Sequence, residues 1–390
     1  MIAPHRRSVL GGLCSCGLLG LGGCVTNMAN EAPMTAGYRP QSDTDEGGLW
    51  YIVDRVERNV ERSRYRVRDP DWNTYLTDIV RRLSPDLHAD MRVYLLRAPY
   101  FNASMAPNGM MQVNSGLLLR AKDEAQLAAV IGHEIGHYTQ KHGLARMRDA
   151  KARADVGIFL SMGLALAGVG AAGDLANLLL IAGQYSYSRE HEREADEIGL
   201  QRMAAAGYRP MAASEVWQQL IEEDEADPNR QSPSVLFATH PAQQERMETL
   251  KGRAQQISGG DRHADRYRTH ISKIRALLLE DELRLRQYDR SLVLLRRLQA
   301  ETPEDGELIY FEGEVYRLRD GDGDRRLARE TYEKALAAGG CPPEAWRALG
   351  QIQRKDSQHD AARGSFRRYL ELKPEADDRM IIKSYLERSV

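Results

Sequence analysis

A His-Glu-Ile-Gly-His motif at residues 133–137 constrains the fold of this chain more than any other feature of its sequence. Two histidines four residues apart lie on one face of a helix about one turn from each other, so both imidazoles can reach a single metal ion. Glu134 follows the first histidine directly and is turned toward the water that such a metal would activate, where a carboxylate can act as general base. The motif therefore predicts a helix that carries a zinc site for hydrolysis.

A catalytic zinc ion needs a third protein ligand besides His133 and His137, and it keeps an open fourth position. The sequence after His137 lacks a His-x-x-Gly-x-x-His spacing, so the third ligand is expected to be a distant carboxylate. The charged segment 188–196 supplies the candidates. From the residues alone, four side chains of this segment stay open as ligands: Glu190, His191, Glu192 and Glu194.

The order of these two segments, His-Glu-x-x-His and then Ser-Arg-x-x-Glu-x-x-Ala-Asp, resembles the zinc metallopeptidase family of HtpX and the CAAX prenyl endopeptidase, which are gluzincins. The resemblance extends over about residues 49–250. It implies that Glu192 is the third zinc ligand and that Asp196, one turn later, orients a ligand histidine. This ligand set implies one Zn²⁺ per chain.

A second segment, Thr239-His240-Pro241 with Arg246, resembles the stretch after the third ligand in the periplasmic branch of the same family. The resemblance leaves two roles for His240: it donates to the oxyanion of the reaction, or it becomes a fourth zinc ligand that keeps the site latent. Arg246 is expected to stabilise the same oxyanion or to pair with a carboxylate. His142 and His191 are expected to be bystanders.

The N-terminal half of the chain predicts a mainly α-helical peptidase domain, α+β in class, over residues 49–255, with a small sheet beside the helix of the motif. Helices are predicted over residues 49–83, with a break at Asp69-Pro70, and over residues 117–140 and 185–206. Short strands are predicted over residues 91–97, 100–105 and 110–113.

The family resemblance also covers the stretch just before the predicted helix of the motif. It implies that an edge strand there pairs with the backbone of a peptide substrate. The residues expected to contact the substrate are Asn102, Ala103, Pro107, Asn108 and Gly109.

Residues 262–390 repeat with a period near 34, which is typical of the tetratricopeptide (TPR) repeat. The clearest copy contains Trp346, Leu349, Gly350, Ala362, Phe366 and Pro374. Two weaker copies precede it, and residues 375–388 predict a closing helix. We therefore expect a C-terminal α-helical TPR-like solenoid that recruits protein partners. Because the zinc set lies within residues 133–196, we expect the chemistry to survive removal of residues 262–390.

The N-terminus predicts export. Residues 1–23 read as a lipoprotein signal peptide, Cys24 as the lipidated residue, and residues 24–48 as a tether between the membrane and the folded body. An uncharged, glycine- and alanine-rich stretch at residues 156–173 has the minimum length of a membrane span, but its modest hydrophobicity favours a buried or interfacial helix.

These features together predict a zinc endopeptidase of the bacterial envelope. The order of lipobox, zinc motif and repeats resembles BepA-type periplasmic metalloproteases, which implies lipid anchoring at the outer membrane, cleavage of misfolded or assembling envelope proteins, and contact with outer-membrane assembly machinery through the TPR groove. The alternative is a chaperone-like scaffold with latent or secondary proteolysis. Lys+Arg number 54 and Asp+Glu 56, so the net charge of −2 gives no electrostatic footprint for nucleic acid.

Overall fold

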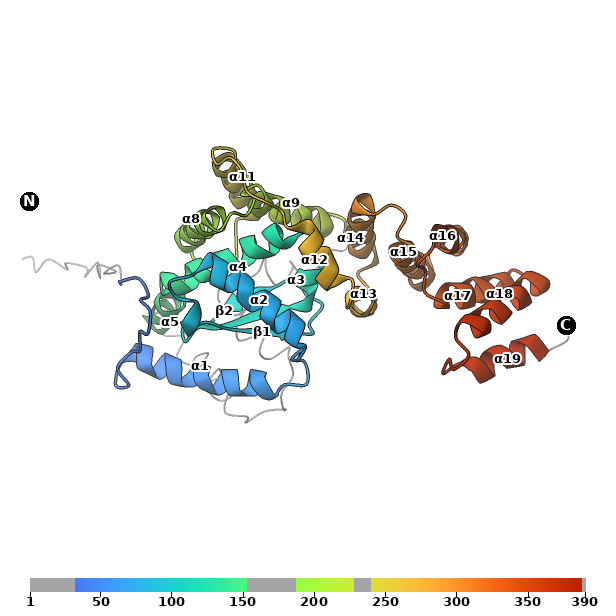
Figure 1. The fold of residues 1–390 in the computed structure, drawn as a ribbon, viewed down its shortest axis with the longest axis horizontal. Helices are drawn as coiled ribbons and strands as arrows, with labels where there is room; N and C mark the ends of the chain where they lie inside the picture. Colours follow the sequence, from blue (N-terminus) through green and yellow to red (C-terminus); the bar gives the residue numbers. More distant parts are fainter. Residues whose placement is uncertain (1–31, 153–186, 228–239, 388–390) are drawn as a thin grey trace, which may run out of the picture. The chain divides into compact units, whose positions relative to one another are not determined.

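The computed structural model describes residues 32–152, 187–227 and 240–387 (Figure 1). The predictions for the signal peptide 1–23, for Cys24 and for the apolar stretch 156–173 lie outside these residues. The described part is mainly helical with one small sheet, which confirms the predicted fold class. Within this part of the chain, no helix combines the length and the apolar character that a membrane crossing requires.

Two helices open the folded body, α1 (Asp45–Arg62) and α2 (Pro70–Leu83). The side chain of Thr44 caps α1 by accepting a hydrogen bond from the Gly47 N–H. Asp69 caps α2 in the same way, and the proline at the first position of α2 costs no intrahelical hydrogen bond. The predicted break at Asp69-Pro70 is confirmed.

The residues just before α1 pack against the folded body, although the sequence predicts a tether up to residue 48. The backbone N–H of Met34 donates to the carbonyl oxygen of Thr139 at 2.8 Å, and the Met34 side chain is buried. The Gly37 N–H donates to the carboxylate of Asp90 at 2.7 Å. We call residues 33–44 the N-terminal arm, since they form part of the folded structure.

The sheet consists of β1 (Arg92–Leu96), β2 (Ala103–Met105) and β3 (Met110–Asn114), in the order β1-β3-β2. β3 pairs in parallel with β1 and antiparallel with β2, which leaves β2 as an edge strand. Gly109 turns the chain between β2 and β3 with a φ of +88°, and a Cβ atom there would lie 2.1 Å from the Asp90 carbonyl oxygen. The strands agree with the predicted ones, except that β2 begins later.

The helix of the motif is α4 (Glu124–Thr139), and the short helix α3 (Ser115–Arg120) precedes it. Asp123 separates them because its carboxylate accepts a hydrogen bond from the Gln126 N–H and caps α4. Nearly every residue of α4 is buried. In Figure 1, α1 lies on one side of the sheet, and α2 and α4 lie on the other.

The other helices follow in chain order. The part predicted to be the peptidase domain, which we call the peptidase half, continues in its described residues with a 3₁₀ turn before β1 and with further helices: η1 (His88–Asp90), α5 (His142–Ala152), α8 (Arg189–Ala205), α9 (Ala212–Glu225) and α11 (Gln243–Ala254). The second half contains α12 (Ala264–Ile271), α13 (Arg275–Arg284), α14 (Tyr288–Glu301), α15 (Gly306–Arg319), α16 (Asp324–Ala338), α17 (Glu344–Lys355), α18 (His359–Leu372) and α19 (Arg379–Glu387).

Helices α15 to α18 form two helix pairs with matching contacts. A Cβ atom at Gly313 would lie 2.6 Å from the ring of Tyr332 in the next helix, and a Cβ atom at Gly350 would lie 2.7 Å from the ring of Phe366. A glycine on the first helix of each pair therefore makes room for an aromatic ring on the second. Tyr332 and Phe366 are 34 residues apart, as the predicted period requires, whereas Gly313 and Gly350 are 37 apart, because the earlier pair has three more residues between its glycine and its aromatic ring.

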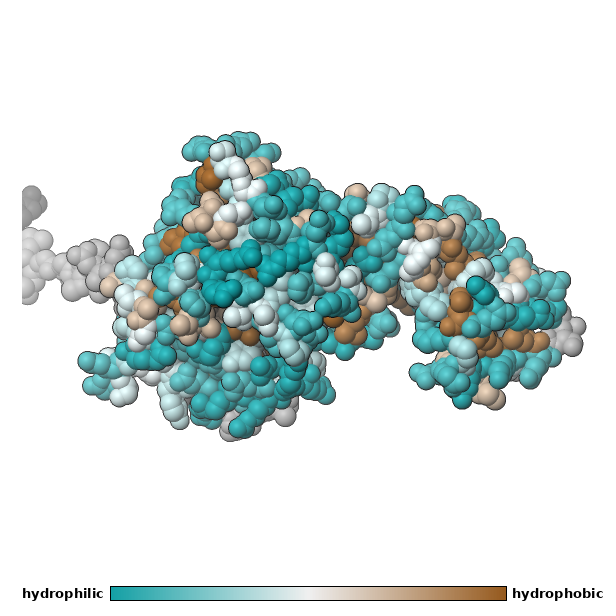
Figure 2. Space-filling view, viewed as in Figure 1, coloured by the Kyte–Doolittle hydropathy of each residue, from teal (hydrophilic) through white to brown (hydrophobic). Residues whose placement is uncertain are grey.

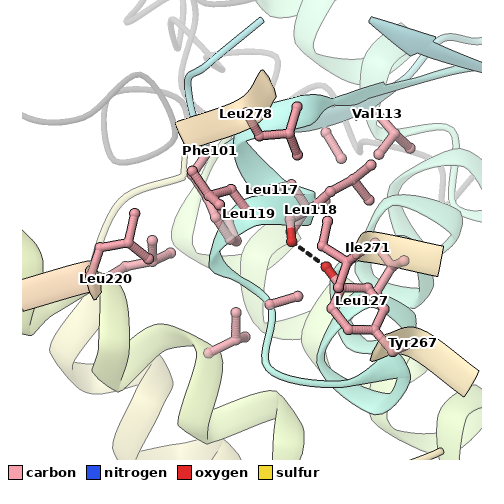
Figure 3. Packing of buried hydrophobic residues seen from close by; sticks show 14 of the residues in the cluster. Phe101, Val113, Leu117, Leu118, Leu119, Leu127, Leu220, Tyr267, Ile271 and Leu278 are labelled. Atoms are coloured by element: carbon pink, nitrogen blue, oxygen red, sulfur yellow. Dashed lines mark hydrogen bonds between the residues drawn. The ribbon is translucent and has the colours of Figure 1, made fainter. Parts of the chain in front are cut away.

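The apolar core does not stop where the sequence predicts the repeat region to begin. One cluster of buried residues runs from Met34 to Ile352. Figure 3 shows Tyr267 and Ile271 of α12 and Leu278 of α13 packed with the leucines of α3, and the Tyr267 hydroxyl donates to the Leu118 carbonyl oxygen. Helices α12 and α13 therefore share the core of the peptidase half.

The visible face of the molecule is mostly hydrophilic, with hydrophobic residues gathered over the last helices (Figure 2). The large apolar side chains exposed at this end are Leu372, Met380 and Ile381.

Candidate metal centre

Four buried side chains converge in the peptidase half: His133, His137, Glu192 and His240. The two histidines of the motif come from α4, Glu192 from the first turn of α8, and His240 from the segment before α11. One possible ligand atom from each of the four lies within 4.8 Å of those from the other three. Among the residues that the structure describes, no other group of this kind is found.

Small residues bring α4 and α8 together. A Cβ atom at Gly136 would lie 2.8 Å from the Ala195 carbonyl oxygen, and one at Gly199 would lie 2.8 Å from the backbone nitrogen of His133. The two backbones therefore approach so closely that a side chain at either glycine would collide with the facing helix. This close packing places the first two turns of α8 against the histidines of the motif.

The distances in this group fit a zinc ion. The Nε2 atoms of His133 and His137 are 3.1 Å apart, and the nearest Glu192 oxygens lie 3.6 Å and 3.5 Å from them. Tetrahedral zinc with ligand bonds of about 2.0–2.1 Å separates its ligand atoms by about 3.3 Å. Two imidazoles and a carboxylate are also the donor types of catalytic zinc sites.

The charges of Glu192 and His137 suit a cation. Burial by itself would raise the pKa of the Glu192 carboxyl, but the adjacent His240 and His137 outweigh burial and hold that pKa far below its usual range. Burial lowers the pKa of His137 well below its usual value. Glu192 is therefore anionic and His137 neutral at pH 7, and these are the forms that bind metal.

His133 is backed by a buried ion pair. Its Nδ1 atom lies 2.9 Å from Asp196 Oδ1, and the Arg246 guanidinium donates to both oxygens of Asp196 at 2.7 and 2.6 Å. Arg246 also lies 2.5 Å from Glu192 and stacks on the ring of Trp217, with 4.2 Å between the guanidinium carbon and the ring centroid. Of the two roles predicted for Arg246, carboxylate pairing is the one seen in this geometry.

Glu134 is almost fully buried, and its Oε1 atom has no hydrogen-bond partner among the described residues. Burial raises the pKa of this carboxyl. The Nε2 atom of His240 lies 3.7 Å from Oε1. A carboxylate with an unused lone pair and raised basicity, beside three metal donors, has the properties of a general base.

A partly open pocket adjoins Glu134 and His133. Its walls are mainly apolar and come from α4, α8, α9 and the segment before β2. Phe101, Val130, Leu200, Val216, Trp217 and Leu220 line it.

His240 belongs to the converging group. Its Nδ1 atom is 2.9 Å from Glu192 Oε1 and 3.3 Å from His133 Nε2, while its Nε2 atom faces Glu134. Both roles predicted for His240 are compatible with these distances, because the ring lies beside the donor atoms and beside the general-base candidate.

Sequence reasoning missed two side chains that touch His137. The ring of Tyr187 stacks on it at 3.8 Å between centroids, and the Nδ1 atom of His142 lies 2.9 Å from its Nδ1 atom. The expectation that His142 is a bystander is therefore wrong. Lys141 explains the error: its φ of 52° lets the chain reverse after α4 and returns His142 to the motif, which helical periodicity does not reveal.

The other candidates of segment 188–196 lie away from the metal donors. The Glu190 side chain is 77% exposed. His191 stacks on the ring of His142 at 4.2 Å, and Glu194 accepts a hydrogen bond from His142 at 3.1 Å. Glu192 is the member of this segment whose carboxylate points at both histidines of the motif.

The residues predicted to contact substrate divide into two groups. Ala103 begins the edge strand β2, which packs against α4, and Asn102 precedes it. Asn108 is a correction: its side chain is buried and donates to Asp54 and Glu57 of α1 at 2.8 and 2.7 Å. Its amide therefore fastens the turn that includes Pro107 and Gly109 to α1, and it is not free to bind a substrate.

Comparisons with known proteins agree with this geometry. A family model described as peptidase family M48 matches residues 70–254, from the start of α2 to the end of α11. A beta-barrel assembly-enhancing protease of Escherichia coli K12 is 29% identical over 215 residues, which cover 52% of this chain and 43% of that protein.

Mitochondrial relatives also match part of this chain. The metalloendopeptidase OMA1 of Schizosaccharomyces pombe is 31% identical over 160 residues, which cover 41% of this chain and 45% of the relative. Human OMA1 is 33% identical over 168 residues, which cover 40% of this chain and 31% of the relative. Each match spans less than half of the relative's length. The predicted resemblance to a metallopeptidase family is confirmed, and residues 70–254 of this chain form a peptidase family M48 domain.

Proposed function

We propose that this chain is a zinc endopeptidase that cleaves unfolded polypeptides in the cell envelope. The observation that carries the proposal is the convergence of His133, His137 and Glu192 beside the buried carboxylate of Glu134. These three side chains would hold one zinc ion. Asp196 would keep His133 in orientation through its 2.9 Å contact with Nδ1.

The reaction follows from the positions of these residues. When bound, zinc supplies a Lewis acid for the attacking water and the scissile carbonyl. Glu134 takes a proton from the attacking water and returns it to the leaving amine. Its raised pKa improves it as a base near neutral pH, and its buried position excludes competing solvent.

An extended peptide fits the surface beside these residues. The outer side of β2 has no strand partner in the described part of the chain, so a substrate backbone can pair with it by β-augmentation. The apolar pocket next to Glu134 then offers contacts to an apolar side chain of the substrate. Such a site recognises unfolded segments, because folded proteins keep extended backbone and apolar side chains inside.

The test is a Glu134→Gln variant assayed with an unfolded model polypeptide. We expect cleavage to fall by about 10²–10⁴-fold, the scale of lost general acid–base catalysis, while the zinc content stays at about one ion per chain. Glu190→Gln, the same change at an exposed position on α8, is the matched control and should keep full activity. Wild-type protein without zinc, or Glu134→Gln with full activity, would refute the proposal.

A chaperone-like role with latent proteolysis is the second candidate, and the position of His240 favours it. Its Nδ1 atom lies among the metal donors, so a fourth protein ligand there would close the tetrahedral site. His240→Ala should then raise proteolysis while zinc remains bound. If His240 is instead an oxyanion donor, the same variant should lose about 10²–10³-fold in rate. The sign of the change decides between the two roles.

The cellular setting rests on the N-terminal sequence and on the relatives. The predicted lipidation of Cys24 and the beta-barrel assembly-enhancing name of the Escherichia coli relative support a place in the periplasm, anchored to the outer membrane. Substrates would be unfolded or assembling envelope proteins, and the TPR-like helices would recruit them or their assembly machinery. Cys24→Ala should release the protein from membranes, which fractionation of cell extracts measures.

A further inference from the structure

We infer that His142 and Glu194 form a hydrogen-bond relay that fixes the ring of His137 and thereby sets the zinc affinity of the site. The inference deepens the proposed function and depends on zinc binding. It starts from two distances: His142 Nδ1 lies 2.9 Å from His137 Nδ1, and His142 Nε2 lies 3.1 Å from a Glu194 oxygen.

The direction of both hydrogen bonds follows from the metal site. His137 points its Nε2 atom at the other donors, so this nitrogen must offer its lone pair and Nδ1 must carry the proton. Nδ1 of His142 must then accept, which places the proton of a neutral His142 on Nε2. That proton is donated to Glu194, so a single arrangement of protons satisfies all three side chains.

The relay at His137 differs from the hydrogen bonding that orients the other ligand histidine, His133. His133 meets a carboxylate directly, and Arg246 neutralises that carboxylate. Between His137 and its carboxylate stands a buried neutral ring, and the Glu194 side chain is 51% exposed. Ligand histidines usually donate to a carboxylate, a backbone carbonyl or water, so an imidazole acceptor serves only while it is kept in the correct tautomer. Glu194 is the group that selects this tautomer.

The packing around His142 leaves it little freedom. The ring of His191 covers one side at 4.2 Å, and His142 itself is buried. Rotation of the ring would bury an unpaired N–H and leave His137 Nδ1 without an acceptor, and each such loss costs about 1–3 kcal/mol. His142 and Glu194 are therefore positioning residues that act through His137.

Variants at Glu194 test the relay without disturbing the core, because this side chain is half exposed. Glu194→Lys replaces the acceptor by a donor and favours the wrong tautomer of His142, so zinc affinity should fall by about 10-fold or more, toward the 10–100-fold range for such partners. Glu194→Gln keeps an acceptor oxygen and should stay within about threefold of wild type, which is the rescue expected of a conservative change. Affinity is measured by competition with a chromophoric chelator, using the full chain.

Glu190→Lys is the matched control, since it makes the same change of charge at an exposed site on the same helix. It should leave affinity unchanged. A fall in affinity equal to that of Glu194→Lys would mean that charge alone acts, and it would overturn the relay. Equal affinity of Glu194→Lys and wild type would also overturn it.

Variants of His142 itself supply an independent measurement. His142→Leu removes the acceptor and should weaken zinc binding by about 10–100-fold, whereas His142→Asn places an oxygen near the position of Nδ1 and should recover most of the loss. An asparagine variant as weak as the leucine variant would refute the relay. If wild-type protein binds no zinc, the proposed function fails instead, so the two failures are distinguishable.

Discussion

The two ends of α4 are held by different kinds of contact. At the N-terminal end, Arg262 and Arg266 reach the buried carboxylates of Asp123 and Glu124, at 2.6 and 2.9 Å. At the C-terminal end, the arm supplies a backbone hydrogen bond and an apolar side chain from Met34. Both sets of contacts come from outside residues 49–255, the range that sequence patterns assign to the peptidase domain.

The N-terminal end depends on ion pairs whose carboxylates are buried, although the side chains of Arg262 and Arg266 are 38% and 28% exposed. Asp123 and Glu124 are fully buried, and the Tyr208 hydroxyl also donates to Glu124 at 2.8 Å. Removing one partner of a buried ion pair is strongly destabilising, because it leaves a buried charge without compensation. This end of α4 therefore depends on α12, which carries Arg266.

The C-terminal end depends on packing and on softer contacts. The Lys141 ammonium lies 3.9 Å from the ring centroid of Tyr38 and 3.1 Å from Glu46. No buried carboxylate depends on the Met34 side chain there, so its partial loss leaves no uncompensated charge. The comparison therefore predicts that α4 needs α12, at the start of the repeat region, to stay folded. Single residues of the N-terminal arm contribute less to the stability of the fold.

The largest expected effect comes from cutting the chain before α12. A protein that ends at residue 261 loses Arg262, Arg266 and the Tyr267 hydrogen bond to Leu118, and it leaves Asp123 and Glu124 buried without those partners. We expect it not to fold, contrary to the sequence-based expectation that the chemistry survives. Circular dichroism and thermal unfolding measure this.

A cut at residue 304 is the matched control, because it keeps α12, α13 and α14 and removes only the later helices. This shorter protein should fold and cleave an unfolded model polypeptide. If the protein that ends at residue 261 folds equally well, the contrast between the two ends of α4 is wrong.

The next effect concerns the buried charges that join α3 to the repeat side. Arg120 is 4% exposed and donates to Glu223 of α9 and Glu282 of α13. Arg120→Met leaves both carboxylates buried without this partner and should lower the free energy of unfolding by about 3–5 kcal/mol. Arg97→Met breaks a pair with Asp281 whose arginine is 40% exposed, so it should cost under about 1 kcal/mol. Urea unfolding measures both values.

The ion pairs of Glu223 with Arg120 and Arg297 should weaken in acid. Burial tends to raise the pKa of Glu223, but Arg120 and Arg297 outweigh burial and lower it. A carboxyl with a depressed folded-state pKa stabilises the fold above its unfolded pKa of about 4.3, and this stability is lost as pH falls through the lower folded value. The difference in unfolding free energy between wild type and Glu223→Gln should therefore be constant from about pH 8 to 5 and shrink at lower pH. A difference that grows in acid would contradict this assignment.

Patterns within short stretches of sequence predicted the helices and strands that such stretches determine by themselves. The helix of the motif, the break at Asp69-Pro70 and the three strands follow from periodicity and capping, and all are present. Glu192 required the family resemblance, because periodicity cannot distinguish it from Glu190 or Glu194.

Contacts between residues far apart in the sequence could not be predicted from such patterns. His142 returns to the motif through one left-handed residue, and Met34 lies in a segment whose composition is that of a linker. Arg262 and Tyr267 lie at the start of a region whose period suggests an independent repeat domain. In each case the decisive partner lies on a different element, so the sequence carries no local signal for the contact.

A smaller effect than that of Arg120→Met is expected at the C-terminal end of α4. Met34 is 7% exposed, its side chain borders a small cavity with Met105, Pro107 and Tyr138, and its N–H donates to Thr139. Met34→Ala removes the side chain but keeps the backbone hydrogen bond, so it should cost about 2 kcal/mol, the lower end for buried methionine. Met34→Leu conserves volume and should cost less than about 1.5 kcal/mol. Zinc affinity should stay unchanged in both, because neither His137 nor its relay loses a partner. A loss of zinc in Met34→Ala would show that the arm acts on the site itself and that the two ends of α4 are equally coupled to its chemistry.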